Sequence, residues 1–222
     1  MNNFTVNLIQ LLYKHTDLKN KEIVVLGQNI INHYAKLETF FDQFQINAYP
    51  KDVTSFFQLL QVKKIKFIET TDTWENVVSD YKEVDIVFNF GMSGRVFDQV
   101  NFFTNMHNRV KVGGLIVHSN PWFTWVDSQM FNYSPSFYAN LAKANDYEVL
   151  QERLGTSTGE MFDKSKFSPE YKNDYYRLKH QTTQYDRGMS WGYRAPAYCG
   201  VIYKKTNDNQ FKYGSLNVQE DD

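Results

Sequence analysis

Three places in the sequence join a buried strand to residues that suit ligand binding. They are Gly27-Gln28-Asn29 after an apolar run, Glu69 at the end of KIKFIE, and Asn89-Phe90-Gly91 at the end of VDIVFNFG. A glycine lets the backbone approach a ligand closely. A carboxylate can accept hydrogen bonds from both hydroxyls of a ribose, and an aromatic face can line a pocket. In an open parallel sheet, ligands bind at the carboxyl ends of the strands, so these residues predict one pocket.

Four further side chains could act on a substrate beside that pocket. His118 follows the apolar run at 115–117, and histidine suits proton transfer near neutral pH, although a structural, hydrogen-bonded histidine is the alternative. The planar fork of Arg95 could bind a phosphate or carboxylate, or Arg95 could be a surface residue that opens a helix. Trp122 could be a substrate platform or part of the core. Asp127 could orient a substrate hydroxyl or cap a turn.

Composition excludes several classes of protein. The 222 residues are 42% hydrophobic and 17% aromatic, which is typical of a globular chain. The 24 basic and 25 acidic residues give a formal net charge of -1, so we expect no nucleic-acid partner. One cysteine and dispersed histidines predict neither a disulfide framework nor a metal site. With no run of about 18 apolar residues and no signal-peptide pattern, we expect a cytoplasmic protein with no membrane partner.

Apolar runs of strand length alternate with helical patterns, which predicts an α/β fold. We expect helices near 4–13, 35–44, 52–60 with Asp52 as N-cap, 101–109, and after the Ser134-Pro135 pair. Strands are expected at 22–27, 64–69, 77–78, 85–90, 115–118, from 148, and at 198–203. Right-handed crossovers would make this a Rossmann-like, doubly wound, mostly parallel seven-stranded sheet with helices on both faces.

We expect residues 1–222 to form a single domain with three additions. They are an N-terminal helix within 1–20, a long aromatic-rich insertion before the last strand at 156–196, and a polar tail at 212–222. A loop this long inside a compact domain usually serves as a cover or an interface arm. The insertion therefore predicts a pocket cover or a homo-oligomer contact.

Two segments after the pocket residues carry a family resemblance. KVGGLIVHS combines a Gly-Gly turn with a strand, and FNYSPSFYANLAKANDYEVL combines a Ser-Pro helix with a Tyr-Glu exit. Together with VDIVFNFG they resemble the second half of a class I S-adenosylmethionine-dependent methyltransferase domain. The branch is one often seen beside sugar and nucleotide-sugar genes. The resemblance covers about residues 21–150 and the last strand.

The resemblance implies S-adenosylmethionine as cofactor and assigns residues to its parts. Gly27 and the adjacent Gln28 would lie under the methionine part, Glu69 would bind the ribose, and Asp80 would lie near the adenine. The turn Asn89-Phe90-Gly91 would lie near the sulfonium.

Three departures from the family pattern concern the same loops. The family's GxGxG is reduced to Gly27 followed by Gln28 and Asn29. Its Glu-His pair after the fourth strand is Gly94-Arg95 here, and its Asn-His after the fifth strand is Asp127-Ser128. Two histidines that could serve as general bases in relatives are therefore missing.

Two functions follow from this pattern. One is transfer of a methyl group from S-adenosylmethionine to a small polar acceptor such as a sugar or nucleotide-sugar, with His118 as the candidate general base. The other is a binding or assembly module that keeps the methyltransferase fold without catalysis. The reduced glycine loop, the missing histidines and the aromatic insertion favour the second, and fold alone does not decide between them.

Overall fold

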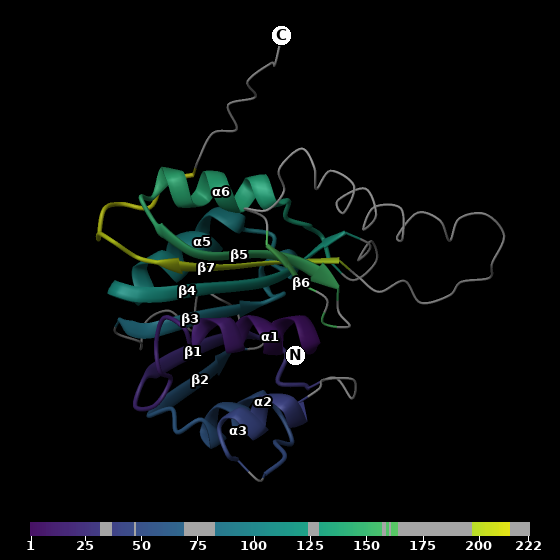
Figure 1. Cartoon of the computed structure of the whole chain (residues 1–222). Helices are drawn as coiled ribbons and strands as arrows, with labels where there is room; N and C mark the ends of the chain where they lie inside the picture. The colour runs from purple at the N-terminus through teal and green to yellow at the C-terminus, as the bar shows by residue number, and fades with distance from the viewer. Residues whose placement is uncertain are drawn as a thin grey trace, which may run out of the picture.

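The computed structural model describes residues 1–31, 37–46, 48–68, 83–123, 129–156, 159, 161–163 and 197–213. These residues form an α/β fold with one sheet (Figure 1). The helices are α1 (Asn3–Leu12), α2 (Leu37–Gln43), α3 (Val53–Leu59), the 3₁₀ turn η1 (Ser93–Arg95), α5 (Gln99–Arg109) and α6 (Pro135–Ala144). The strands are β1 (Glu22–Gly27), β2 (Lys64–Ile68), β3 (Val84–Phe90), β4 (Val110–Phe123), β5 (Glu148–Thr156), β6 (Met161–Asp163) and β7 (Ala197–Lys204).

The sheet is mixed and mostly parallel. Six strands in the order β2-β1-β3-β4-β7-β5 form its body, and the three-residue β6 pairs with the outer edge of β5. Strands β2, β1, β3 and β4 run parallel, whereas β7 is antiparallel to both β4 and β5. The strand predicted at 77–78 lies outside the described residues. The short β6 was not predicted and falls within the segment expected to be the insertion.

Two apolar layers cover the two faces of the sheet. Successive residues of a strand point to opposite faces, so a strand buried on both sides supplies both layers. On β1, Ile23 and Val25 pack in the layer of α1, α2 and α3, which we call the α1 face. Val24 and Leu26 pack in the layer of α5 and α6, which we call the α5 face. The expected helices on both faces are therefore present among the described residues.

Capping residues begin two of the predicted helices. Asp52 is the N-cap of α3, and its carboxylate accepts the backbone N–H of Ser55 at 2.7 Å. Ser134 is the N-cap of α6, and Pro135 occupies the first turn, where its missing N–H costs nothing. Both helix starts are confirmed.

Helix α1 packs directly on the sheet near its carboxyl-end edge. A Cβ atom on Gly200 of β7 would lie 2.8 Å from the ring of Phe4, so the helix approaches the strand this closely only over a glycine. Thr5 Oγ1 lies 2.8 Å from Ser119 Oγ on β4. The predicted N-terminal helix is thus fixed to the two central strands β4 and β7.

Strand β4 is longer than the 115–118 predicted. It begins at Val110, passes through the Gly-Gly pair with a register shift against β3, and runs on to Phe123 beside β7. The expected turn at Gly113-Gly114 is therefore an irregularity inside the strand, where Gly113 has a φ of 82° and its N–H donates to Lys205 O. No described helix is long and apolar enough to span a membrane.

Candidate functional site

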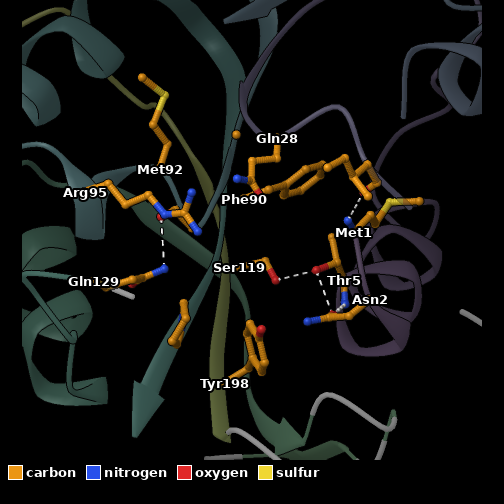
Figure 2. A pocket seen from close by; sticks show the side chains of 14 residues that line it. Met1, Asn2, Thr5, Gln28, Phe90, Met92, Arg95, Ser119, Gln129 and Tyr198 are labelled. Carbon is orange, nitrogen blue, oxygen red and sulfur yellow. Dashed lines mark hydrogen bonds between the residues drawn. The ribbon is translucent and has the colours of Figure 1, made fainter. Parts of the chain in front are cut away.

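A cavity of about 120 Å³ lies at the carboxyl ends of β1, β3 and β4 (Figure 2). It lies on the α1 face, beneath the first turn of α1. Its described lining is Met1, Asn2, Thr5, Gly27, Gln28, Ile30, Phe90, Gly91, Met92, Arg95, Ser119, Pro121, Gln129 and Tyr198. Five residues that the sequence singled out line this cavity: Gly27, Gln28, Phe90, Gly91 and Arg95.

Two glycines bring the ends of β1 and β3 together. Gly27 and Gly91 form an isolated antiparallel bridge. A Cβ atom on Gly27 would lie 2.9 Å from Phe90 O, and Gly91 has a φ of 78°, which strongly favours glycine. The backbone of these two strand ends therefore forms a compact floor for the cavity.

Asn89 holds the loop that follows β3, although its side chain does not line the cavity. Its side chain is fully buried, and Oδ1 accepts the backbone N–H groups of Met92 and Ser93 at 3.1 and 3.2 Å. Its amide donates to Ser93 Oγ at 2.8 Å and lies 3.1 Å from His118 Nδ1. Asn89 is not among the lining residues, and its observed role is to hold the η1 turn in place.

His118 lies on the opposite side of the sheet from the cavity. On β4 the odd residues Leu115, Val117 and Ser119 face α1, so His118 faces α5. It is 1% exposed, packs against Tyr138 with ring centroids 5.1 Å apart, and burial lowers its pKa to about 3. We expected this histidine at the rim of the pocket. The structure instead places a neutral imidazole in the core, where Nδ1 accepts the Asn89 amide.

Arg95 reaches the cavity from η1. Figure 2 shows its guanidinium directed toward the centre of the cavity, and no described residue forms a hydrogen bond or ion pair with that guanidinium. Its neighbour Gly94 allows the segment at 129–131 to come close. Met130 N and Phe131 N both donate to Gly94 O, at 2.7 and 3.1 Å. A Cβ atom on Gly94 would lie 2.0 Å from Gln129 Oε1. The Gly94-Arg95 pair therefore combines tight packing with a cation that has no partner among the described residues.

The sequence reasoning missed the hydroxyl and amide groups that line the cavity beneath α1. Thr5 and Ser119 are 3% and 2% exposed, and Asn2 caps α1 by accepting Thr5 N at 2.9 Å. Ser119 was identifiable from the alternation of β4, because it lies two residues after the apolar Val117 and therefore on the same face of the strand. The sequence predicted an N-terminal helix packed on the edge of the fold, but not that its first turn would lie over the ends of these strands.

The remaining predicted residues lie elsewhere or outside the described chain. Trp122 is half-buried and packs on the α5 face, away from the cavity lining. Glu69, Asp80 and Asp127 lie outside the described residues, and their assigned roles stay predictions. The residues that the structure describes contain no group of three or more His, Cys, Asp or Glu able to hold a metal ion.

Comparison with solved structures identifies the fold. No protein-family model and no curated protein matches the chain. A structure from Galdieria sulphuraria, described as a candidate sarcosine dimethylglycine methyltransferase, superposes with a TM-score of 0.51 at 14% identity. The match covers 92% of this chain and 86% of that one. The chain has the class I methyltransferase fold.

A second structure has the same methyltransferase fold. It is a chain from the complex between the Haloferax volcanii Trm112 methyltransferase activator and a candidate methyltransferase, with a TM-score of 0.50 at 10% identity. The match covers 92% of this chain and 90% of that one. At such low identities the likeness establishes the fold, and function has to be argued from the cavity.

Proposed function

We propose that this protein is an S-adenosylmethionine-dependent methyltransferase that acts on a small polar acceptor such as a sugar or nucleotide-sugar. The observation that carries the proposal is the position of the cavity. It opens at the carboxyl ends of β1 and β3, the edge at which open α/β sheets bind their ligands. Of the seven residues assigned to the cofactor, Gly27, Gln28, Phe90 and Gly91 line it, Asn89 does not, and Glu69 and Asp80 lie outside the described residues.

The described residues fit one part of the cofactor. The cavity of about 120 Å³ is smaller than the roughly 300–1,000 Å³ of complete small-molecule sites, and it suits the amino-acid end of S-adenosylmethionine. Gly27 and Gln28 would hold that end. Because Gly27 has no side chain and lies close to Phe90 O, backbone atoms form the floor of the cavity there. The ribose and adenine would extend past the end of β2, toward Glu69 and Asp80.

When bound, S-adenosylmethionine supplies a methyl group that needs little activation. The protein would align the acceptor with that group and exclude water from it. No His, Asp or Glu is among the described lining residues, and the hydroxyl groups among them belong to Thr5, Ser119 and Tyr198. We therefore propose an acceptor that is nucleophilic at the working pH and needs no general base from these residues.

One observation favours a binding module without catalysis as the second candidate. The Gly27–Gly91 bridge joins the two strand ends across the floor, and the cavity above it is small. A protein that no longer binds the cofactor could keep a cavity narrowed in this way. In that case the fold would present its surfaces to a partner and transfer nothing.

Calorimetric titration with S-adenosylmethionine and S-adenosylhomocysteine separates the two candidates. We expect micromolar dissociation constants for both ligands. Glu69→Ala should weaken binding about ten- to a hundredfold, because a charged acceptor of this kind contributes roughly 1.5–3 kcal/mol. Lys143→Gln, on the exposed surface of α6, serves as the matched control and should bind like the parent. No heat of binding at millimolar ligand would exclude the enzyme.

A further inference from the structure

The described lining of the cavity includes a positively charged side chain and no negatively charged one. Among the described lining residues Arg95 carries a permanent charge, and none is Asp or Glu. A cationic ligand would therefore find no carboxylate on these walls. An anionic ligand would meet a cation together with several neutral hydrogen-bond donors.

The guanidinium of Arg95 is free to bind such a ligand. It has no hydrogen-bond or ion-pair partner among the described residues, although the buried network around Asn89 fixes the η1 turn that carries it. Its planar fork matches the two oxygens of a carboxylate or phosphate, and such bidentate pairs are stronger than neutral hydrogen bonds.

A second donor faces the cavity from the opposite wall. Asn2 is 7% exposed, and its Oδ1 is occupied by Thr5 N and Thr5 Oγ1 at 2.9 and 3.0 Å. Its amide NH₂ has no partner among the described residues, and Figure 2 shows it turned toward the cavity. The first turn of the ten-residue α1 lies beside it, with no acidic residue and with the positive end of the helix dipole.

We propose that the acceptor carries an acid group, a carboxylate or a phosphate, which Arg95 and the Asn2 amide hold in this cavity beside the amino-acid end of the cofactor. The inference rests on the proposed function, because it names the class of acceptor for the same site. An acid group fixed at this end would orient the rest of the acceptor relative to the methyl donor. Neutral sugars would then bind more weakly than their acidic derivatives.

Ligand-observed NMR titrations with matched probes test this preference without requiring turnover. The probes are glucuronate and glucose 6-phosphate, each compared with glucose, with S-adenosylhomocysteine as the cofactor arm. We expect the parent to bind at least one acidic probe ten times more tightly than glucose. Arg95→Gln should abolish that preference, and Arg95→Lys should keep part of it, since the charge remains but the fork is lost. Lys143→Gln removes one exposed positive charge and should change nothing.

The titration with S-adenosylhomocysteine tests whether Arg95 binds an acid group of the acceptor or the carboxylate of the cofactor. We expect Arg95→Gln to leave the affinity for S-adenosylhomocysteine within about twofold of the parent. A tenfold loss would assign the guanidinium to the carboxylate of the cofactor and overturn the inference. Equal binding of glucose and both acidic probes to the parent would overturn it as well. A parent that binds acidic probes but not S-adenosylhomocysteine would refute the methyltransferase and leave the anion site standing.

Discussion

Neighbouring residues of β4 face opposite layers, and this alternation separates the histidine from the cavity. Ser119 lines the cavity beneath α1, whereas His118 is buried between α5, α6 and β7. The sequence analysis placed His118 at the carboxyl end of a strand, whereas β4 runs past both residues to Phe123. A residue can act as a general base in the cavity only if its side chain points to the same face of the sheet. Neighbouring residues of a strand point to opposite faces.

The buried state of His118 makes stability depend on pH. Unfolded, the imidazole binds a proton below its ordinary pKa of 6.5, whereas burial lowers the folded pKa to about 3. As pH falls from about 6.5 toward 3, the unfolded state gains a proton that the folded state cannot take. The free energy of unfolding should therefore fall by up to roughly 1.4 kcal/mol per pH unit from this group.

Urea unfolding at pH 7 and pH 4.5, for the parent and for His118→Gln, measures that contribution. Glutamine can accept the Asn89 amide and does not titrate in this range. The variant should lose less stability between the two pH values than the parent. Equal losses of stability in the parent and the variant would mean that burial does not prevent protonation of His118. An imidazole that titrates near pH 6.5 by NMR would contradict the prediction in the same way.

At the scale of elements, the loop after β3, which contains η1, is held by buried polar side-chain contacts. Asn89 and His118 are register partners on the adjacent parallel strands β3 and β4, which explains why their side chains meet. Ser93 joins this pair and accepts the Asn89 amide. The cation of Arg95 is therefore positioned by residues that never touch the cavity.

Most elements were predictable from the sequence because their signals are local. Apolar runs fixed β1 and β3, and N-cap residues fixed the starts of α3 and α6. The sequence predicted five of the fourteen described lining residues, since the rest of the lining depends on where α1 packs. That position is set by the fit of Phe4 over Gly200, a contact between residues 196 positions apart (200 − 4). No pattern within a short window specifies such a contact.

The hydrogen bond between Thr5 and Ser119 should couple α1 to β4. Both side chains are buried, so Thr5→Val leaves the Ser119 hydroxyl without this partner at little change in volume. In a double-mutant cycle with Ser119→Ala we expect a coupling of about 0.5–1.5 kcal/mol in the free energy of unfolding. The cycle of Thr54→Val with Ser119→Ala is the control, because Thr54 bonds Asn29 and shares no partner with Ser119. Additive effects in both cycles would show that this contact does not fasten the helix.

At the scale of the whole molecule, the cavity is built from both ends of the chain. Asn2 and Thr5 come from the first helix, and Tyr198 comes from the last strand, which lies between β4 and β5. The segment at 164–196 precedes that strand in the sequence. Its position in the sequence makes it a natural candidate for a cover.

We propose that the part of the predicted 156–196 insertion that follows β6, the aromatic-rich segment at 164–196, covers the cavity or forms a subunit contact. Exposed aromatic surface costs about 25 cal/mol per Å², which favours burial against something. Replacing 164–196 with a short Gly-Ser linker, which leaves β6 intact, should change either the mass in light scattering or the affinity for S-adenosylhomocysteine. A folded deletion variant with the mass and affinity of the parent would make the segment a dispensable loop.

The central claim is that the carboxyl ends of β1 and β3 hold the amino-acid end of the cofactor. A crystal structure with S-adenosylhomocysteine tests it most directly. We predict that the amino-acid end of the ligand lies above the Gly27–Gly91 bridge, in contact with Gln28 and Phe90, with the adenosine extending past β2. Ligand bound elsewhere on the molecule, or a cavity that stays empty in crystals grown with millimolar S-adenosylhomocysteine, would contradict this account.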